Sequence, residues 1–221
     1  MKVFIGVGHG GSDPGAAANK TKEKDLNLSI ALACRDELKR HGVSVKMSRT
    51  KDENDTLSEE IKECNAFAPD LAVDIHNNAG GGDGAEVFYH YGGGKSKTLA
   101  DNILGEIVKV GQNSRGAKIR KNSQGKDYYG FIRETSAPAV IVECAFVDNA
   151  SDLKILATEG KRQSVGEAIA KGILKTLGVG IQSDKPSLYR VQVGAYLLKD
   201  NAEAMHRKLK AIGFDAFIVK E

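Results

Sequence analysis

The sequence predicts an α/β protein with a mostly parallel twisted sheet and helices on both faces, followed by a small C-terminal βαβ segment. Segments with strand patterning alternate with segments of helical periodicity, which is typical of parallel sheets. The last strand pattern of the main domain is continuously apolar, as in a strand buried on both faces. We therefore expect a main domain over residues 1–178, a linker containing Ser and Pro over 179–187, and a separate segment over 188–221.

The first half of the chain is predicted to run strand, helix, strand, helix, strand. An alternating run rich in Val, Ile and Phe predicts the first strand, which ends at a Gly-rich turn carrying His9. Apolar residues at a spacing of four then predict a helix with one buried face, which Gly42 terminates. The expected ranges are 2–7 (strand), 25–40 (helix), 43–47 (strand), 57–66 (helix) and 70–75 (strand).

The second half continues the alternation and then repeats it on a smaller scale. Gly-rich loops bracket the next predicted strand and allow tight bends there. The expected ranges are 85–91 (strand), 96–110 (helix), 111–130 (exposed polar loop), 139–144 (buried strand), 153–156 (helical turn) and 162–177 (helix). Beyond the linker, the patterns predict a strand over 188–196, a helix over 201–212 and a strand over 216–219.

Composition excludes several classes of protein. The 221 residues are 41% hydrophobic and 28% charged, as in a folded globular protein. The net charge of +3 is too small to indicate a nucleic-acid partner, and no run of about 18 apolar residues predicts a membrane span. The three cysteines match neither a disulfide framework nor a CxxC zinc site, so we expect buried, reduced thiols.

Polar side chains stand where the predicted strands end. His9 follows the first strand, His76 follows the third, and Glu143 lies near the end of the buried strand, while Glu23 precedes the first helix on the same edge as His9. Two imidazoles and a carboxylate are a common set for a catalytic Zn2+ ion. Such an ion makes hydroxide available near neutral pH, and Glu143 remains for proton transfer, which together suit hydrolysis of an amide.

Each of these residues also has a simpler interpretation. His9 alone could be a solvated loop residue, His76 could cap a turn, and Glu23 could be a charge interacting with the helix dipole. Glu143 is harder to dismiss, because an ionised carboxylate at the end of an apolar strand is costly unless it is paired, metal-bound or solvated. Arg133 could position a substrate or form an ion pair with its neighbour.

Five motifs in order resemble the zinc N-acetylmuramoyl-L-alanine amidases of the type-3 amidase family. The resemblance implies hydrolysis of the amide bond between N-acetylmuramoyl residues and L-alanine in peptidoglycan. It also implies zinc held by His9, Glu23 and His76, Glu143 as the catalytic acid/base, and a substrate lying beside Asn77 and Asn78. The motifs are Gly8-His9-Gly10-Gly11, Asp13-Pro14-Gly15, Glu23-Lys24-Asp25-Leu26-Asn27-Leu28, Ile75-His76-Asn77-Asn78-Ala79 and Glu143-Cys144-Ala145-Phe146.

The chain departs from the family's pattern at three places, none of which changes an expected ligand. Val7-Gly8 stands where Asp-Pro is usual, Asp74 replaces a common Ser, and Ala145 replaces a Gly. Asp74 adds a charge near His76, so the surroundings of that ligand are expected to differ.

The end of the chain resembles the first half of a SPOR domain, a glycan-strand binder of bacterial walls. The resemblance rests on residues 189–196, the helix pattern after them and residues 214–219. A unit of two strands and one helix buries little surface and should be marginal alone. We therefore expect two copies to complete one sheet and form a homodimer; a shortened chain is the alternative.

The biological setting is open at this level. The chain reaches Gly8 too soon for a secretory signal, so we expect a protein made in the cytoplasm that acts on the cell wall after release. A phage endolysin is the favoured setting, and a mother-cell autolysin of sporulation is the alternative. A zinc peptidase or deacetylase with the same ligands, and an inactive wall-binding protein, are competing interpretations.

Overall fold

The computed structural model describes residues 1–18, 21–181 and 192–219. It divides into two units, Met1–Gln182 and Ser183–Glu221.

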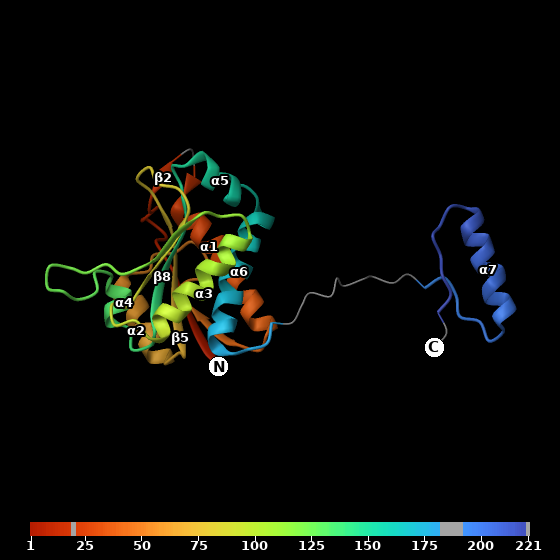
Figure 1. Ribbon diagram of the computed structural model, residues 1–221, viewed down its shortest axis with the longest axis horizontal. Coiled ribbons are helices and arrows are strands. Elements are labelled where there is room, and N and C mark those ends of the chain that lie inside the picture. The colour runs from red at the N-terminus through yellow and green to blue at the C-terminus, as the bar shows by residue number, and fades with distance from the viewer. Residues whose placement is uncertain (19–20, 182–191, 220–221) are drawn as a thin grey trace. The chain divides into compact units, whose positions relative to one another are not determined.

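The first unit is built on a six-stranded sheet in the order β4-β1-β5-β8-β6-β7 (Figure 1). All neighbouring strands run parallel except β6 and β8, which pair antiparallel. A two-residue hairpin, β2 (Ala17–Ala18) with β3 (Thr21–Lys22), precedes the first helix. The sheet strands are β1 (Lys2–Val7), β4 (Ser44–Met47), β5 (Leu71–Asn78), β6 (Ala85–Tyr89), β7 (Ser114–Lys118) and β8 (Ala139–Phe146).

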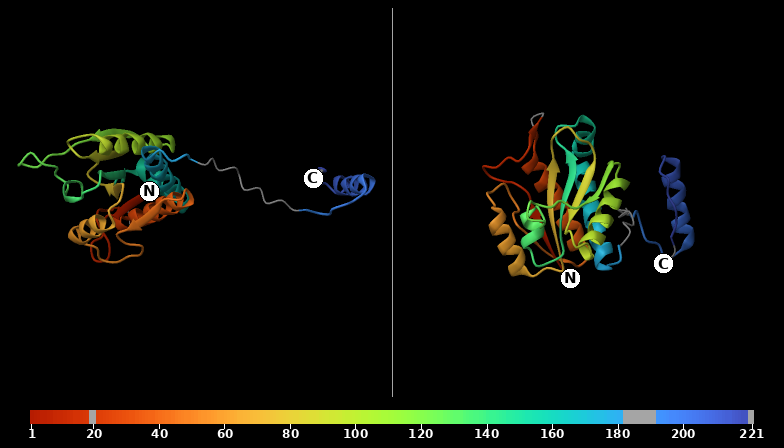
Figure 2. Two further views of the ribbon diagram at one scale, coloured as in Figure 1. Left: turned by 90° about the horizontal axis from the view of Figure 1, so that it is seen from below. Right: turned by 60° about the vertical axis from the view of Figure 1, so that its left-hand side comes forward.

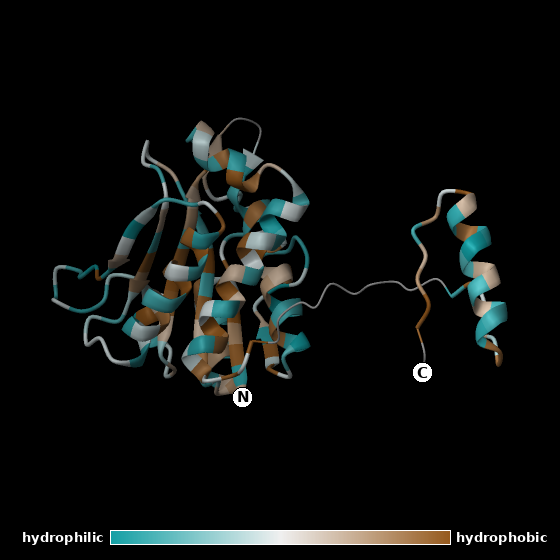
Figure 3. Cartoon of the chain, turned by 45° about the vertical axis from the view of Figure 1, so that its right-hand side comes forward, coloured by the Kyte–Doolittle hydropathy of each residue, from teal (hydrophilic) through white to brown (hydrophobic). Residues whose placement is uncertain are grey.

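Helices cover both faces of this sheet (Figures 1 and 2). The long helices α1 (Glu23–Arg40), α3 (Lys95–Lys109) and α6 (Glu159–Leu177) cover one face, with α6 packed against both α1 and α3. The shorter α2 (Leu57–Phe67) and α4 (Gly130–Glu134) cover part of the other, and α5 (Ala150–Leu156) leads into α6. Apolar residues lie mainly on the strands and on the inner sides of the helices (Figure 3).

The strands supply a separate core to each face because their side chains alternate. On β5, Val73 and Ile75 belong to the large cluster under α1, α3 and α6, whereas Ala72 belongs to the small cluster under α2 and α4. Strand β8 divides in the same way between Val142 and Ile141. The cysteines Cys34, Cys64 and Cys144 are free and buried, as expected.

The predicted fold class is confirmed, with four short elements missed, the strands β2, β3 and β7 and the helix α4. Each strand and helix predicted for the first unit is present, with its ends shifted by a few residues. The prediction of a continuous loop over residues 111–130 is wrong, because this range contains β7. This strand, Ser-Arg-Gly-Ala-Lys, has no β-branched residue and is held by its pairing with β6 at the sheet edge. Helix α4 was not predicted either, because it has only five residues.

The second unit contains helix α7 (Lys199–Ala211), close to the predicted range of 201–212. The predicted flanking strands are not found: residues 192–196 and 216–219 lie in no strand, and residues 188–191 are outside the described part. A strand needs hydrogen-bonding partners, and one helix offers none. Across the described ranges, no helix has both the length and the apolar character needed to cross a bilayer.

Candidate metal centre

The candidate site lies at the carboxyl ends of the central strands, on the face that carries α2 and α4. In the sheet register His76 of β5 stands beside Glu143 of β8, which stands beside Glu86 of β6. Side chains directly opposite each other in neighbouring strands share a face, so these three form one row across the sheet. His9 follows β1, the strand on the other side of β5.

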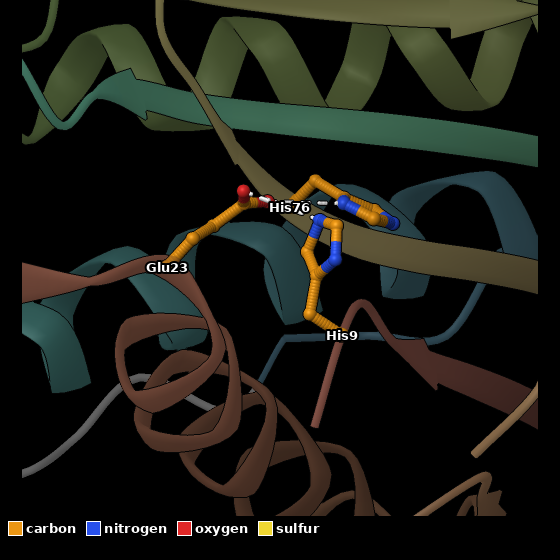
Figure 4. Close-up of side chains that lie close together, drawn as sticks. All are labelled: His9, Glu23 and His76. Atoms are coloured by element: carbon orange, nitrogen blue, oxygen red, sulfur yellow. Dashed lines mark hydrogen bonds and ion pairs between the residues drawn. The ribbon is translucent and has the colours of Figure 1, made fainter. Parts of the chain in front are cut away.

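Three side chains from distant parts of the chain converge there (Figure 4). Nε2 of His9 lies 3.2 Å from Oε2 of Glu23, and Nδ1 of His76 lies 3.1 Å from Oε1 of the same carboxylate. One atom from each of the three residues can be chosen so that all lie within 4.8 Å of one another. Two ligand atoms of a tetrahedral zinc ion are about 3.3 Å apart, so the donor set fits zinc in both type and spacing.

The outward nitrogen of each imidazole contacts an aspartate. Nδ1 of His9 lies 2.7 Å from Oδ2 of Asp13, and Nε2 of His76 lies 3.0 Å from Oδ2 of Asp74. A carboxylate that accepts the N–H of one ring nitrogen leaves the other nitrogen's lone pair for a metal. The contacts therefore orient Nε2 of His9 and Nδ1 of His76 toward Glu23.

Two glycines, Gly8 and Gly15, leave room for the side chains of the expected metal ligands. A Cβ on Gly8 would lie 2.1 Å from the His76 ring, and one on Gly15 would lie 2.6 Å from both Glu23 and the His9 ring. Gly15 also has a φ of 63°, which strains residues with a side chain. His9 itself has a φ of 62°, an uncommon conformation for a non-glycine residue. The turn after β1 is thus shaped around the rings.

Glu23 is the first residue of α1, and its carboxylate is 4% exposed. Its Oε2 accepts the backbone N–H of Ala16 at 2.9 Å, and its Oε1 accepts that of Asn77 at 3.1 Å. Asn27, one helical turn later, donates to the Gly8 carbonyl at 2.9 Å. The helix start is therefore tied to both histidine-bearing strands.

The buried side chain of Arg49 links the backbone segments that carry His9 and Glu23. Its side chain is buried and its guanidinium donates to the carbonyls of Val7, Gly8 and Lys24 at 2.8–3.2 Å. These carbonyls belong to the segments that carry His9 and Glu23. A buried fork of five donors suits such a clamp, which lysine could not form.

Charge in the cluster favours a cation. The pKa of His9 is raised, mainly by its contact with Glu23. Burial would lower the pKa of His76, but Asp74 and Glu23 outweigh it and raise that pKa well above the ordinary value. Burial likewise would raise the pKa of Glu23, yet contacts with His76 and His9 hold it well below its usual range. Carboxylates thus surround both rings, and a divalent cation would supply the positive charge in place of protons.

Glu143 is placed and tuned for proton exchange. Burial raises its pKa to about 7, although the nearby His76 lowers it. Its Oε2 is buried without a hydrogen-bond partner among the described residues. A carboxyl group of this kind is present in both protonation states near neutral pH, which a general acid/base requires.

The other predicted site residues have different surroundings. Asn77 is 2% exposed and donates to Asn27 on the opposite face, and its expected contact with the substrate stays a prediction. Asn78 is half-buried and donates to Glu86 at 2.8 Å. Arg133 donates to two loop carbonyls and to Glu134, and it borders a cavity near the start of β8, away from the row of Glu143.

Several contributing residues received no role from the sequence. Asp13 belongs to the Asp13-Pro14-Gly15 motif, and Asp74 is a departure from the family's pattern. Arg49 gave no signal, since a basic residue after a short strand is ordinary. Glu86 did give one, because it is a single charge inside the otherwise apolar strand β6, where it pairs with Arg115 and Lys118.

Comparison with known families agrees with this geometry. Residues 3–175 match the family model described as N-acetylmuramoyl-L-alanine amidase, and residues 166–220 match that of the SPOR domain.

Similar curated proteins include N-acetylmuramoyl-L-alanine amidases and a phage endolysin. The chain is 36% identical to N-acetylmuramoyl-L-alanine amidase CwlM of Bacillus licheniformis, with 99% of this chain and 85% of that protein covered. It is 35% identical to the sporulation-specific N-acetylmuramoyl-L-alanine amidase of Bacillus subtilis, with 99% and 84% covered. It is also 34% identical to the endolysin of Bacillus phage SPP1, with 91% and 77% covered.

Solved structures with the same fold point the same way. Cwp6 from Clostridium difficile superposes with a TM-score of 0.78 at 39% identity, covering 80% of this chain and 29% of that one. The catalytic domain of the amidase CwlV from Bacillus (Paenibacillus) polymyxa superposes with a TM-score of 0.73 at 30% identity, covering 81% and 99%.

Proposed function

Because this chain belongs to the N-acetylmuramoyl-L-alanine amidase family, we propose that it cleaves the amide bond between N-acetylmuramoyl residues and L-alanine in peptidoglycan with the help of a zinc ion. Its His9, Glu23 and His76 would hold the ion. One observation carries the proposal of zinc: three donors of the right type lie within 4.8 Å of one another. The aspartate behind each ring supports the same assignment.

The chain's own residues then divide the work of hydrolysis. Zinc bound at this site would polarise the scissile carbonyl and favour ionisation of a water molecule. Glu143 takes a proton from the attacking water and delivers it to the departing L-alanine amine. Its pKa of about 7 suits both transfers at one pH. Asn78 and Glu86, next to Glu143 on the same face, border the place where the substrate must lie.

Metal content and wall lysis together test this proposal. We expect about one zinc ion per chain, clearing of purified sacculi, loss of clearing after chelation and its return with zinc. The products should carry new L-alanine amino groups without new reducing sugars, which separates an amidase from a glycosidase. An inactive wall-binding protein would instead bind sacculi without clearing them, and Glu143→Ala would change nothing.

We propose further that the second unit binds the wall and associates with a second copy. The match to the SPOR model over residues 166–220 supports wall binding. Apolar side chains around α7 are exposed, with Phe214 at 63% and Phe217 at 78%, and a second copy could cover them. Sedimentation of the full chain against residues 1–179 tests the association, because a monomer in both cases removes the dimer.

The setting in which the wall is cut has two candidates. Similarity to a phage endolysin over 91% of the chain supports lysis of a host after release from the cytoplasm. Similarity to a sporulation-specific amidase over 99% of the chain favours an autolysin of the mother cell as the second candidate. Expression after prophage induction, rather than during sporulation, would identify the first.

A further inference from the structure

Two buried acids lie behind His76: Asp74, which contacts its Nε2, and Glu60, which has no part in the proposed hydrolysis. Glu60, on α2, is 7% exposed, and Asp74, on β5, is 3% exposed. Glu60 forms no ion pair within the described residues that would offset a buried charge. Oε1 of Glu60 and Oδ1 of Asp74 are each buried without a hydrogen-bond partner.

These two unpartnered oxygens face the same small space. A Cβ built on Gly6 would lie 2.0 Å from Oε1 of Glu60 and 2.7 Å from Oδ1 of Asp74. Gly6 pairs with Asp74 in the sheet register, so the space exists because residue 6 has no side chain. The two carboxyl groups therefore meet over Gly6.

Two carboxyl groups that face one buried space repel each other when both are ionised, which favours a proton on one of them. One proton between them satisfies both oxygens at once, because a carboxylic acid donates one hydrogen bond and a carboxylate accepts it. Asp74 is the acceptor, since its other oxygen, Oδ2, already faces Nε2 of His76 at 3.0 Å. Burial, followed by the charge of Asp74, raises the pKa of Glu60 well above its ordinary value, in keeping with Glu60 as the protonated partner.

We propose that Glu60 is a positioning residue: as a neutral acid it donates a hydrogen bond to Asp74, which accepts the Nε2–H of His76 and so presents Nδ1 of that ring to the metal site. The inference rests on the proposed zinc site. In this arrangement Asp74 orients His76 on the same strand, β5, and Glu60 of helix α2 in turn orients Asp74. Glu60 touches neither the substrate nor the metal and acts through Asp74.

Glutamine and leucine at position 60 separate this role from simple packing. Glu60→Gln keeps an N–H donor toward Asp74, whereas Glu60→Leu removes the donor and keeps a similar volume. Glu63→Gln on the same helix is the matched control, because Glu63 is half-exposed and pairs with Lys46. Zinc affinity is measured in the full chain by competition with a chromophoric chelator. We expect Glu60→Leu to weaken zinc binding roughly 10- to 100-fold, and Glu60→Gln and Glu63→Gln to leave it nearly unchanged.

An infrared difference spectrum reports the proton without any metal. At pH 8 the ion-free wild type minus Glu60→Gln should show the C=O stretch of a protonated carboxylic acid, and the wild type minus Glu63→Gln should not. Absence of that band overturns the proposal, as does tight zinc binding by Glu60→Leu or equal damage by Gln and Leu. Failure of the wild type to bind zinc would instead count against the proposed function, while the band would still show whether Glu60 holds the proton.

Discussion

The two faces of the central sheet differ more than any other two regions of the molecule. Under α1, α3 and α6 the strands present mainly apolar side chains to a large core, with Val73 and Ile75 of β5 fully buried and Asn77 a polar exception at the end of that strand. On the other face the same strand presents Asp74 and His76, and β8 presents Glu143. Alternation along a strand thus separates stability from chemistry by one residue. A substitution on one face should therefore leave the property supplied by the other face largely intact.

The largest effect that would test this separation is at Glu143. Glu143→Gln should lower kcat on sacculi roughly 10²- to 10⁴-fold, because it removes the group that transfers the proton. Its free energy of unfolding should not fall, since the carboxyl's burial opposes ionisation and the amide carries no charge. Turbidity clearing and urea unfolding measure the two quantities, with Glu167→Gln as the control, at a half-buried position of α6 where the carboxylate accepts only from Gln163 on the same helix. Activity within tenfold of the wild type would contradict the role.

A core substitution on the opposite face should do the reverse. Ile103 of α3 is fully buried against Gly172 of α6, and α3 carries no site residue. Ile103→Ala should lower the free energy of unfolding by about 2–5 kcal/mol through lost burial and a cavity, with kcat nearly unchanged. Val108→Ala, at an exposed position of the same helix, should cost under about 0.5 kcal/mol. A large loss of kcat in folded Ile103→Ala would show that the faces are coupled.

The pH dependence of the free energy of unfolding should show how much stability is lost when the buried Glu143 ionises. The pKa of Glu143 is about 7 in the folded protein against 4.5 for an ordinary glutamate, so the folded state binds the proton more tightly. Stability from this group is present below about pH 4.5 and is lost as the pH rises through 7. Relative to ion-free wild type, Glu143→Gln should therefore gain up to about 3 kcal/mol between pH 4 and pH 8. Urea unfolding measures this difference, and a difference in unfolding free energy that is the same at pH 4 and pH 8 would refute the prediction.

The smallest expected effect concerns the exposed support of His9. Asp13 contacts Nδ1 of His9, but its side chain is 65% exposed, so water can partly replace it. Asp13→Ala should weaken zinc affinity by roughly tenfold, the lower end of the range for groups that orient a metal ligand. Asp36→Ala, at a position 64% exposed on α1, is the control. Competition with a chelator measures both, and equal affinities would remove Asp13 from the site.

Local patterns were enough to predict most of the fold and the ligand cluster. The carboxyl ends of parallel strands meet at one edge, and this rule alone predicts that His9, His76 and Glu143 lie together. Strand alternation also determines which face Asn77 occupies. If His76 faces the site, Asn77 must face the opposite side, so its burial was predictable.

The rest depended on tertiary contacts that no local pattern encodes. Glu60 and Asp74 lie on separate elements, and only the packing of α2 on β5 over Gly6 brings them together. Arg49 acquires its role from three carbonyls that belong to two segments. Strand β7 has weak intrinsic preference and forms because β6 offers an edge.

The glycines beside the site limit how this protein can be stabilised by mutation. Replacing glycine by alanine is a common way to stiffen a chain and raise its melting temperature. At Gly6, Gly8 and Gly15 that substitution would put a methyl group where an acid or an imidazole now lies. A variant stabilised in this way would keep every chemical group of the site and still lose the space in which those groups lie together.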